Sequence, residues 1–192
     1  MFAGLTNISL IDLTNFDTAQ VTSMKNMFKG CTSLASLFLS MINTSKVKDM
    51  SYLFNECSSL LYLNLSNFDT SSITTMESMF SSCSSLTSID ISNFETSKVN
   101  HMIITFKNCV SLESLNLSNF KTSSVTNMKG MFQNCKQLSS LDLSNFDVSS
   151  VKIFGYMFDG CSTLKSLNLT NFNTLSASNF LVCLMDAHNY LL

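Results

Sequence analysis

The chain has 192 residues, of which 12% are charged, and a formal net charge of −2 at pH 7. Charged residues are about half as frequent as in an average globular domain, and Ser, Thr and Asn supply most of the polarity. This composition offers no basic surface for nucleic acid, contains no apolar run of about 18 residues that would span a membrane, and begins without the pattern of a signal peptide.

A 26-residue repeat fills most of the chain. A fixed period of this length is typical of solenoids, in which each unit is one coil that buries its apolar side only against its neighbours. We therefore predict a single seven-coil domain over residues 1–182, followed over residues 183–192 by a tail or the start of a further coil. Met1 occupies a repeat position that is Met in several later units, so we expect the chain to be a segment of a longer protein. The units begin at Met1, Met27, Leu53, Met79, Thr105, Met131 and Met157.

The first half of each unit predicts a short strand. Leu or Ile occupies the eighth, eleventh and thirteenth positions, as in Leu60, Leu63 and Leu65. Alternation at the last two positions places their side chains on one side of the strand, and stacking of the units then gives a parallel sheet. An Asn column and a Phe column follow, as in Asn67 and Phe68. We expect the amides to cap the turning backbone and the rings to form a buried stack.

The second half of each unit has apolar residues at spacings of three and four, which predicts one or two turns of helix. A Thr-Ser-Ser segment before them supplies candidate N-caps. A second short strand is the competing prediction for this segment. In one repeat these apolar residues are Val125, Met128, Met131, Phe132 and Cys135.

The unit follows the pattern LxxLxLSNFxTSxVTxMxxMFxxCxSL, to which residues 112–138 conform except at Gln137. This pattern resembles the 26-residue surface repeat and the BspA-like class of leucine-rich repeats, which mycoplasma and Listeria lipoproteins also carry. It departs from the common LxxLxLxxN pattern because Asn falls one position early and Phe takes its place. The resemblance covers residues 1–182 and implies an α/β leucine-rich-repeat-like solenoid with one short parallel strand and one short helix per coil. It also implies a cell-surface or secreted protein that serves adhesion and has no enzyme activity.

The residues that could carry chemistry are few. Six of the seven cysteines share one repeat position, at which the first unit has Leu5, so we expect buried free thiols; disulfides between neighbouring coils are the alternative. There is no CxxC, no Cys/His pair at ligand spacing, no Gly-rich phosphate loop and no nucleophile elbow, and the histidines are His101 and His188 alone. We therefore expect no catalytic residue, no metal and no cofactor.

Side chains between the buried strand positions are expected to face solvent. One such column carries Ser, and the next alternates amide with acid: Asn64, Asp90, Asn116 and Asp142. Alternation keeps like charges about two strand spacings apart, which lowers their repulsion. The same column presents groups that can hydrogen-bond carbohydrate or a protein strand.

Apolar residues interrupt this polar pattern in the first three units. Leu10 and Tyr62 stand in the Ser column, and Phe38 stands in the Asn/Asp column. Clustered exposed apolar side chains mark contact surfaces, and coverage by an upstream segment is an equally weighted alternative. Ile103 and Ile104 replace polar residues and form a second candidate site.

These features predict a non-catalytic recognition or adhesion module that binds protein or carbohydrate. The alternative is a structural solenoid that associates end to end into a filament or surface layer, because open coil ends expose strand edges. Ice binding is a third hypothesis and would use a Thr column: Thr18, Thr44, Thr70, Thr96, Thr122 and Thr174.

Overall fold

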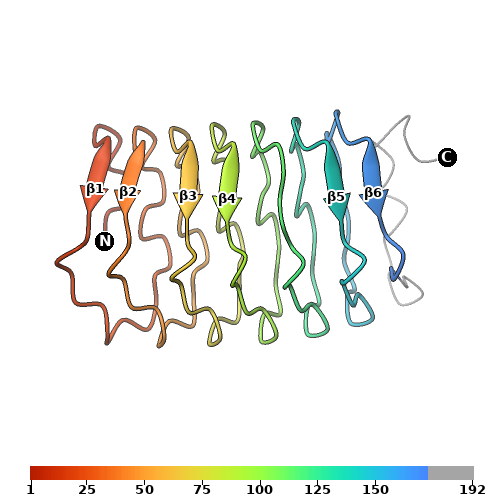
Figure 1. Ribbon diagram of the computed structural model, residues 1–192, viewed down its shortest axis with the longest axis horizontal. Helices are drawn as coiled ribbons and strands as arrows, with labels where there is room; N and C mark the ends of the chain where they lie inside the picture. Colours follow the sequence, from red (N-terminus) through yellow and green to blue (C-terminus); the bar gives the residue numbers. More distant parts are fainter. Residues whose placement is uncertain (173–192) are drawn as a thin grey trace.

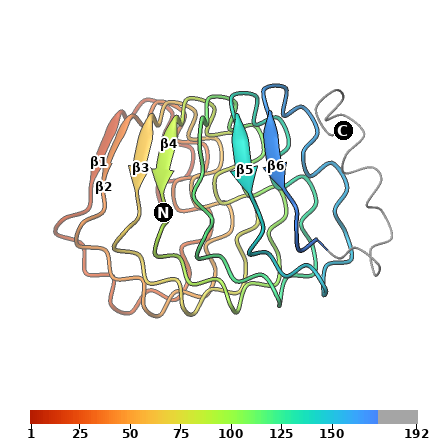
Figure 2. The ribbon, with the colours of Figure 1, turned by 45° about the vertical axis from the view of Figure 1, so that its right-hand side comes forward.

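The computed structural model describes residues 1–172, which form a solenoid of stacked coils (Figure 1). Within residues 1–172, successive 26-residue units stack as coils, and the strands all lie on the same side of the stack (Figure 2). The strands are β1 (Leu10–Asp12), β2 (Ser36–Phe38), β3 (Tyr62–Asn64), β4 (Ser88–Asp90), β5 (Ser140–Asp142) and β6 (Ser166–Asn168).

The strands pair in parallel, β1 with β2, β3 with β4 and β5 with β6. The register is one repeat, so Ile11 lies opposite Leu37. In β1, β3 and β5 the middle residue is buried and its two neighbours are exposed, as in β3 around Leu63. The equivalent residues 114–116 form no strand. The prediction of short parallel strands is thus confirmed, whereas the predicted single sheet is replaced, within the described residues, by three two-stranded sheets.

The second half of each coil is built from tight turns, and residues 1–172 contain no helix. Backbone amides alternate between two kinds of partner. Phe28 N donates to Leu53 O in the next coil at 3.0 Å, whereas Met27 N donates to Met24 O within its own turn at 3.1 Å. Single parallel bridges, such as that between Asp49 and Thr75, continue from coil to coil.

Tight turns therefore stand where a helix was predicted, and the backbone conformation explains the difference. Two positions of each coil adopt positive φ, for example Asn26 at 57° and Gly30 at 72°. A left-handed residue every few positions ends a right-handed helix. The amides of a helix also bond within their own segment, so they could not bond the next coil. Tight turns return side chains inward at intervals of three and four, which is the spacing that indicated a helix.

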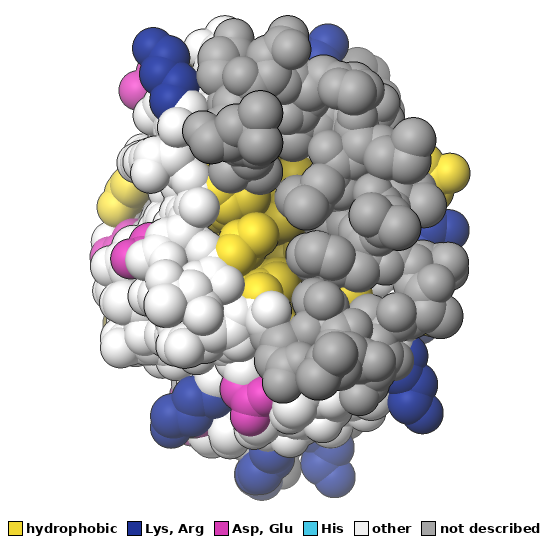
Figure 3. Space-filling model, turned by 90° about the vertical axis from the view of Figure 1, so that its right-hand side faces the viewer, with side chains coloured by type: hydrophobic (Ala, Val, Ile, Leu, Met, Phe, Trp, Pro, Cys, Tyr) yellow, Lys and Arg dark blue, Asp and Glu magenta, His cyan; other side chains and the backbone are white. Residues whose placement is uncertain are grey.

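The core runs the length of the stack. Seen from the C-terminal end, hydrophobic side chains lie in the middle of the cross-section and charged side chains lie on its rim (Figure 3). Within the predicted Phe column, Phe68, Phe94, Phe120 and Phe146 are buried, and the last two rings stack with centroids 6.4 Å apart.

A second Phe column, which the sequence pattern assigned to the helix, forms the longer stack. Neighbouring centroids are 5.4 to 5.8 Å apart and neighbouring rings are within 11° of parallel. Phe28, Phe54, Phe80, Phe106, Phe132 and Phe158 are fully buried, whereas Phe2 at the start of the column is half-buried. The rings of this column are Phe2, Phe28, Phe54, Phe80, Phe106, Phe132 and Phe158.

The cysteine column bonds one coil to the one before it. All six thiols are buried and free. Each sulfhydryl donates to a Phe carbonyl of the preceding coil, with sulfur-to-oxygen distances of 3.1 to 3.2 Å, as from Cys83 to Phe54. These thiols therefore act as small apolar groups that also satisfy a buried acceptor.

The Thr column is also internal. Thr18, Thr44, Thr70, Thr96 and Thr122 are buried. The Thr96 hydroxyl donates to Lys121 O at 2.9 Å and accepts from Lys121 N at 2.8 Å. All five hydroxyls are buried and donate to a backbone carbonyl of the next coil. They cannot meet an ice surface, so the ice-binding hypothesis is wrong for these five residues, and Thr174 lies outside the described residues.

Candidate functional site

The apolar strip predicted from the sequence is exposed on the strand side of the first three coils. Leu10 retains 53%, Phe38 50% and Tyr62 55% of its possible exposure. Two further apolar side chains of these coils, which were not predicted from the sequence, are also exposed: Leu61 at 59% and Met41 at 65%. Both residues depart from the repeat pattern in the sequence. Met41 stands in the Asn column, and the residues equivalent to Leu61 in other units are small or polar. We call these five residues the apolar face.

A hollow of about 420 Å³ lies between β2 and β3 and brings Phe38 and Tyr62 together. Leu10 lies outside its lining, so the strip is one pocket plus a flanking residue. The Asn67 amide donates to Leu39 O at 2.9 Å and thereby fixes one edge of the hollow. The lining contains no charged residue: Leu37, Phe38, Leu39, Ser40, Tyr62, Leu63, Asn64, Ser66 and Asn67.

The amide and acid column beside the hollow forms turns. The side chain of each member accepts from the backbone N–H two residues later, at 2.9 to 3.1 Å; the members are Asn64, Asp90, Asn116 and Asp142. The same kind of bond, from the Ser144 backbone, lowers the pKa of the Asp142 carboxyl. These residues shape the strand side by fixing the turns that follow it.

Ile103 and Ile104 lie apart from the apolar face, in the second half of a coil, and are half-buried. Ile104 has a φ of 46°, which is a strained conformation for a β-branched side chain. Its Cγ2 lies 3.0 Å from the place where a side chain at Gly130 would begin. The neighbouring glycine therefore makes room for Ile104.

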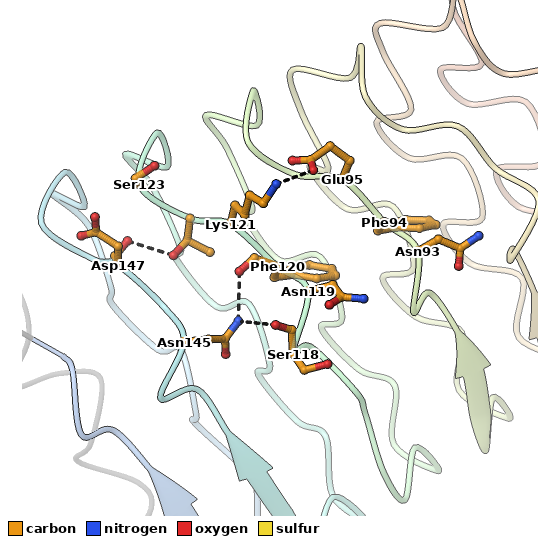
Figure 4. Close-up of a pocket in the computed structure, with 11 residues that line it drawn as sticks. Asn93, Phe94, Glu95, Ser118, Asn119, Phe120, Lys121, Ser123, Asn145 and Asp147 are labelled. Atoms are coloured by element: carbon orange, nitrogen blue, oxygen red, sulfur yellow. Dashed lines mark hydrogen bonds and ion pairs between the residues drawn. The ribbon is translucent and has the colours of Figure 1, made fainter.

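A larger groove, of about 650 Å³, follows the loops after the strand segments of three successive coils (Figure 4). Lys121 Nζ lies 2.7 Å from Glu95 Oε2, and this hydrogen bond lowers the pKa of Glu95 to about 2. Lys121 stands at a repeat position that is otherwise acidic or amide, as at Glu95 and Asp147. The lining residues are Asn93, Phe94, Glu95, Ser118, Asn119, Phe120, Lys121, Thr122, Ser123, Asn145 and Asp147.

Asparagines hold the wall of this groove in place. The Asn145 Nδ2 donates to Ser118 O at 3.2 Å and to Phe120 O at 3.0 Å, and the Asn119 Nδ2 donates to Ser92 O. The predicted capping role of the Asn column is confirmed at these positions. The amide orientation is therefore set by the preceding coil.

The thiols and imidazoles offer no reactive arrangement within residues 1–172. Burial raises the pKa of the Cys57 thiol to about 12, and a protonated thiol is neither a nucleophile nor a metal ligand. No group of three or more His, Cys, Asp and Glu in this part of the chain can hold a metal ion. His101 is exposed, and His188 lies outside the described residues.

Parallel strands, tight turns and stacked core columns define a leucine-rich-repeat-like solenoid. The chain belongs to the family described as "Mycoplasma protein of unknown function, DUF285", whose model matches residues 1–114 and 86–190. This membership confirms the resemblance to the mycoplasma type of surface repeat. Within residues 1–172 no helix is long and apolar enough to cross a membrane.

Two solved leucine-rich repeat proteins are similar to the chain. One, from T. pallidum (TpLRR), has 20% identity and a TM-score of 0.41 over 89% of this chain and 60% of its own. The other, from Bacteroides ovatus, has 19% identity and a TM-score of 0.46 over 88% of this chain and 49% of its own. The chain thus spans 49% to 60% of the length of these proteins. No curated protein matches its sequence.

Proposed function

We propose that the chain is a non-catalytic recognition or adhesion module that contacts a protein partner through the apolar face. The observation that supports it is that Phe38 and Tyr62, each at least half exposed, line one uncharged hollow, and that three more exposed apolar side chains lie in the same three coils: Leu10, Met41 and Leu61. Single exposed apolar residues are ordinary on protein surfaces. A cluster on a strand side that is otherwise Ser, Asn and Asp is characteristic of a contact surface.

The hollow indicates what the partner contributes. Its uncharged lining combines the aromatic groups of Phe38 and Tyr62 with the polar groups of Asn64 and Asn67. A pocket of this kind suits a single apolar side chain of the partner, with backbone hydrogen bonds at the rim. Resemblance to bacterial surface repeats supports a location at the cell surface or outside the cell.

The hollow can be tested with an array of immobilised peptides in which one central Leu, Phe or Met lies among polar residues. Wild-type chain should bind the peptides with an apolar centre, and Phe38→Asn should weaken this binding at least tenfold because anchor pockets carry most of the interface energy. Asn stands in the same column at Asn64, so the change fits the coil. Ile153→Asn, which matches Asn127, is the control for an exposed apolar residue elsewhere. Equal binding by wild type and Phe38→Asn would reject the hollow as the contact site.

End-to-end self-association is the second candidate function. The first coil exposes several apolar side chains, among them Leu5, Ile8 and Phe16. Apolar surface at a coil end can pair with another coil. Sedimentation equilibrium separates the two functions: assembly that increases with concentration and persists in Phe38→Asn supports this candidate, whereas a monomer that binds peptides supports recognition.

A further inference from the structure

We propose that the groove along residues 93–95, 118–123 and 145–147 binds a neutral oligosaccharide that lies along the stack axis. This site is separate from the apolar face and uses none of its residues. It contributes polar groups from three successive coils, in a hollow of about 650 Å³ that opens on the loops beyond the strands (Figure 4).

Hydrogen-bond acceptors repeat along the groove. Asn93, Asn119 and Asn145 occupy the same position of successive coils, which are spaced at about 4.8 Å, like the strands of a sheet. The amide nitrogens of Asn119 and Asn145 donate to backbone carbonyls, so the orientation of each amide is fixed. Their Oδ1 atoms can accept from a ligand without first losing rotational freedom.

Donors and charge define the class of ligand. Lys121 Nζ uses one N–H on Glu95 and has two others to donate. The pKa values of Glu95 and Asp147 are lowered, chiefly by hydrogen bonds from Lys121 and Ser149 respectively, so both groups are negative at neutral pH. Two carboxylates beside one ammonium disfavour an anionic ligand. Hydroxyl groups, which both donate and accept, match the mixed lining.

The spacing favours a sugar chain over a peptide. An extended peptide places side chains on one side about every 6.6 Å, which does not match the coil spacing. Strand addition is disfavoured here because Lys121 N already donates to Thr96 Oγ1 and Val125 N already donates to Thr122 O. Linked pyranose rings repeat on a length closer to that of the coils.

The test is an array of short neutral, sialylated and sulfated oligosaccharides, probed with the whole chain. Wild type should bind a subset of the neutral glycans. Ser123→Trp and Ser118→Trp each fill the groove from an exposed position and leave backbone bonds in place, so each should reduce this binding at least tenfold. Ser140→Tyr is the matched control, because Tyr62 stands in the same column outside the groove. Circular dichroism melts identify any variant that fails to fold, and the second Trp variant then replaces it.

Each result decides the proposal. No binding to any neutral glycan, binding to sialylated or sulfated glycans alone, or displacement of bound glycan by the peptides of the array would overturn it. Unchanged binding by both folded Trp variants would place the glycan elsewhere and also overturn it. The Phe38→Asn variant should retain glycan binding, so failure of this site and failure of the apolar face are separate outcomes.

Discussion

At the scale of single residues, side chains in this fold bond the backbone of the neighbouring coil. The thiol of Cys83 donates to Phe54 O, and the hydroxyl of Thr96 both donates to and accepts from Lys121. The sequence predicted that the cysteines would be buried, because Leu5 shares their column. It could not predict the carbonyl partner, which is 29 residues away and depends on the geometry of the turns.

Alkaline pH should destabilise the protein through the cysteine column. Burial raises the pKa of Cys57 from its ordinary 9.0 to about 12, and that of Cys83 well above 9.0. The folded state therefore favours the protonated thiol, so this stabilisation is complete below about pH 9 and is lost as the pH rises toward 12. Urea unfolding across this range should show the loss. Cys83→Ser, which keeps a donor but does not titrate there, should reduce the slope; an identical slope would show that the thiols do not cause it.

Ile104 should be a site where a polar substitution stabilises the fold. Its φ of 46° is strained for a β-branched residue, whereas Asn26 holds the equivalent position at 57°. Ile104→Asn should raise the free energy of unfolding by about 1 kcal/mol, measured by urea denaturation. Ile103→Asn, at a neighbouring residue without positive φ, serves as the control. Destabilisation by Ile104→Asn would mean that its packing beside Gly130 outweighs the strain.

At the scale of elements, the sequence predicted the strand half of the coil and not the turn half. Alternation of apolar and polar residues around Leu63 predicts a strand, because only a strand places every second side chain on the same side. Spacings of three and four, as between Val125 and Met128, fit both a helix and a series of tight turns. Residues such as Tyr52 and Glu56 have positive φ, which is compatible with turns and not with a helix. Because Tyr and Glu do not favour left-handed backbone, the sequence contained no sign of these turns. The second Phe stack was missed for the same reason.

Phe substitutions should separate the core columns from their exposed end. Phe80→Ala should cost about 3 to 5 kcal/mol, because its ring stacks on both Phe54 and Phe106 at 5.8 and 5.4 Å. Phe94→Ala should cost a similar amount, since Phe94 is buried. Phe16→Ala should cost clearly less, because Phe16 is 41% exposed. Thermal and urea unfolding of the three variants would check this, and equal losses would argue against a core built from stacked columns.

At the scale of the whole molecule, stacking separates stability from recognition. Core columns, thiols and threonines lie inside, while the strand side can change residue by residue without altering the stack. The sequence therefore located Leu10, Phe38 and Tyr62 as departures from the repeat. It did not locate the hollow or the amide groove, because both depend on how loops of neighbouring coils lie in space. Met41 and Leu61 could have been found by the same comparison of columns.

The most direct measurement is adhesion of chain-coated beads to cultured cells, comparing wild type with the triple variant Leu10→Ser, Phe38→Asn and Tyr62→Ser. All three changes restore residue types found in the same columns, so the free energy of unfolding should stay within about 1 kcal/mol. Adhesion should fall at least tenfold, because clustered aromatic anchors carry most of the binding energy. A folded triple variant that adheres as strongly as wild type, or a triple variant that does not fold, would contradict a recognition face that is separate from the core.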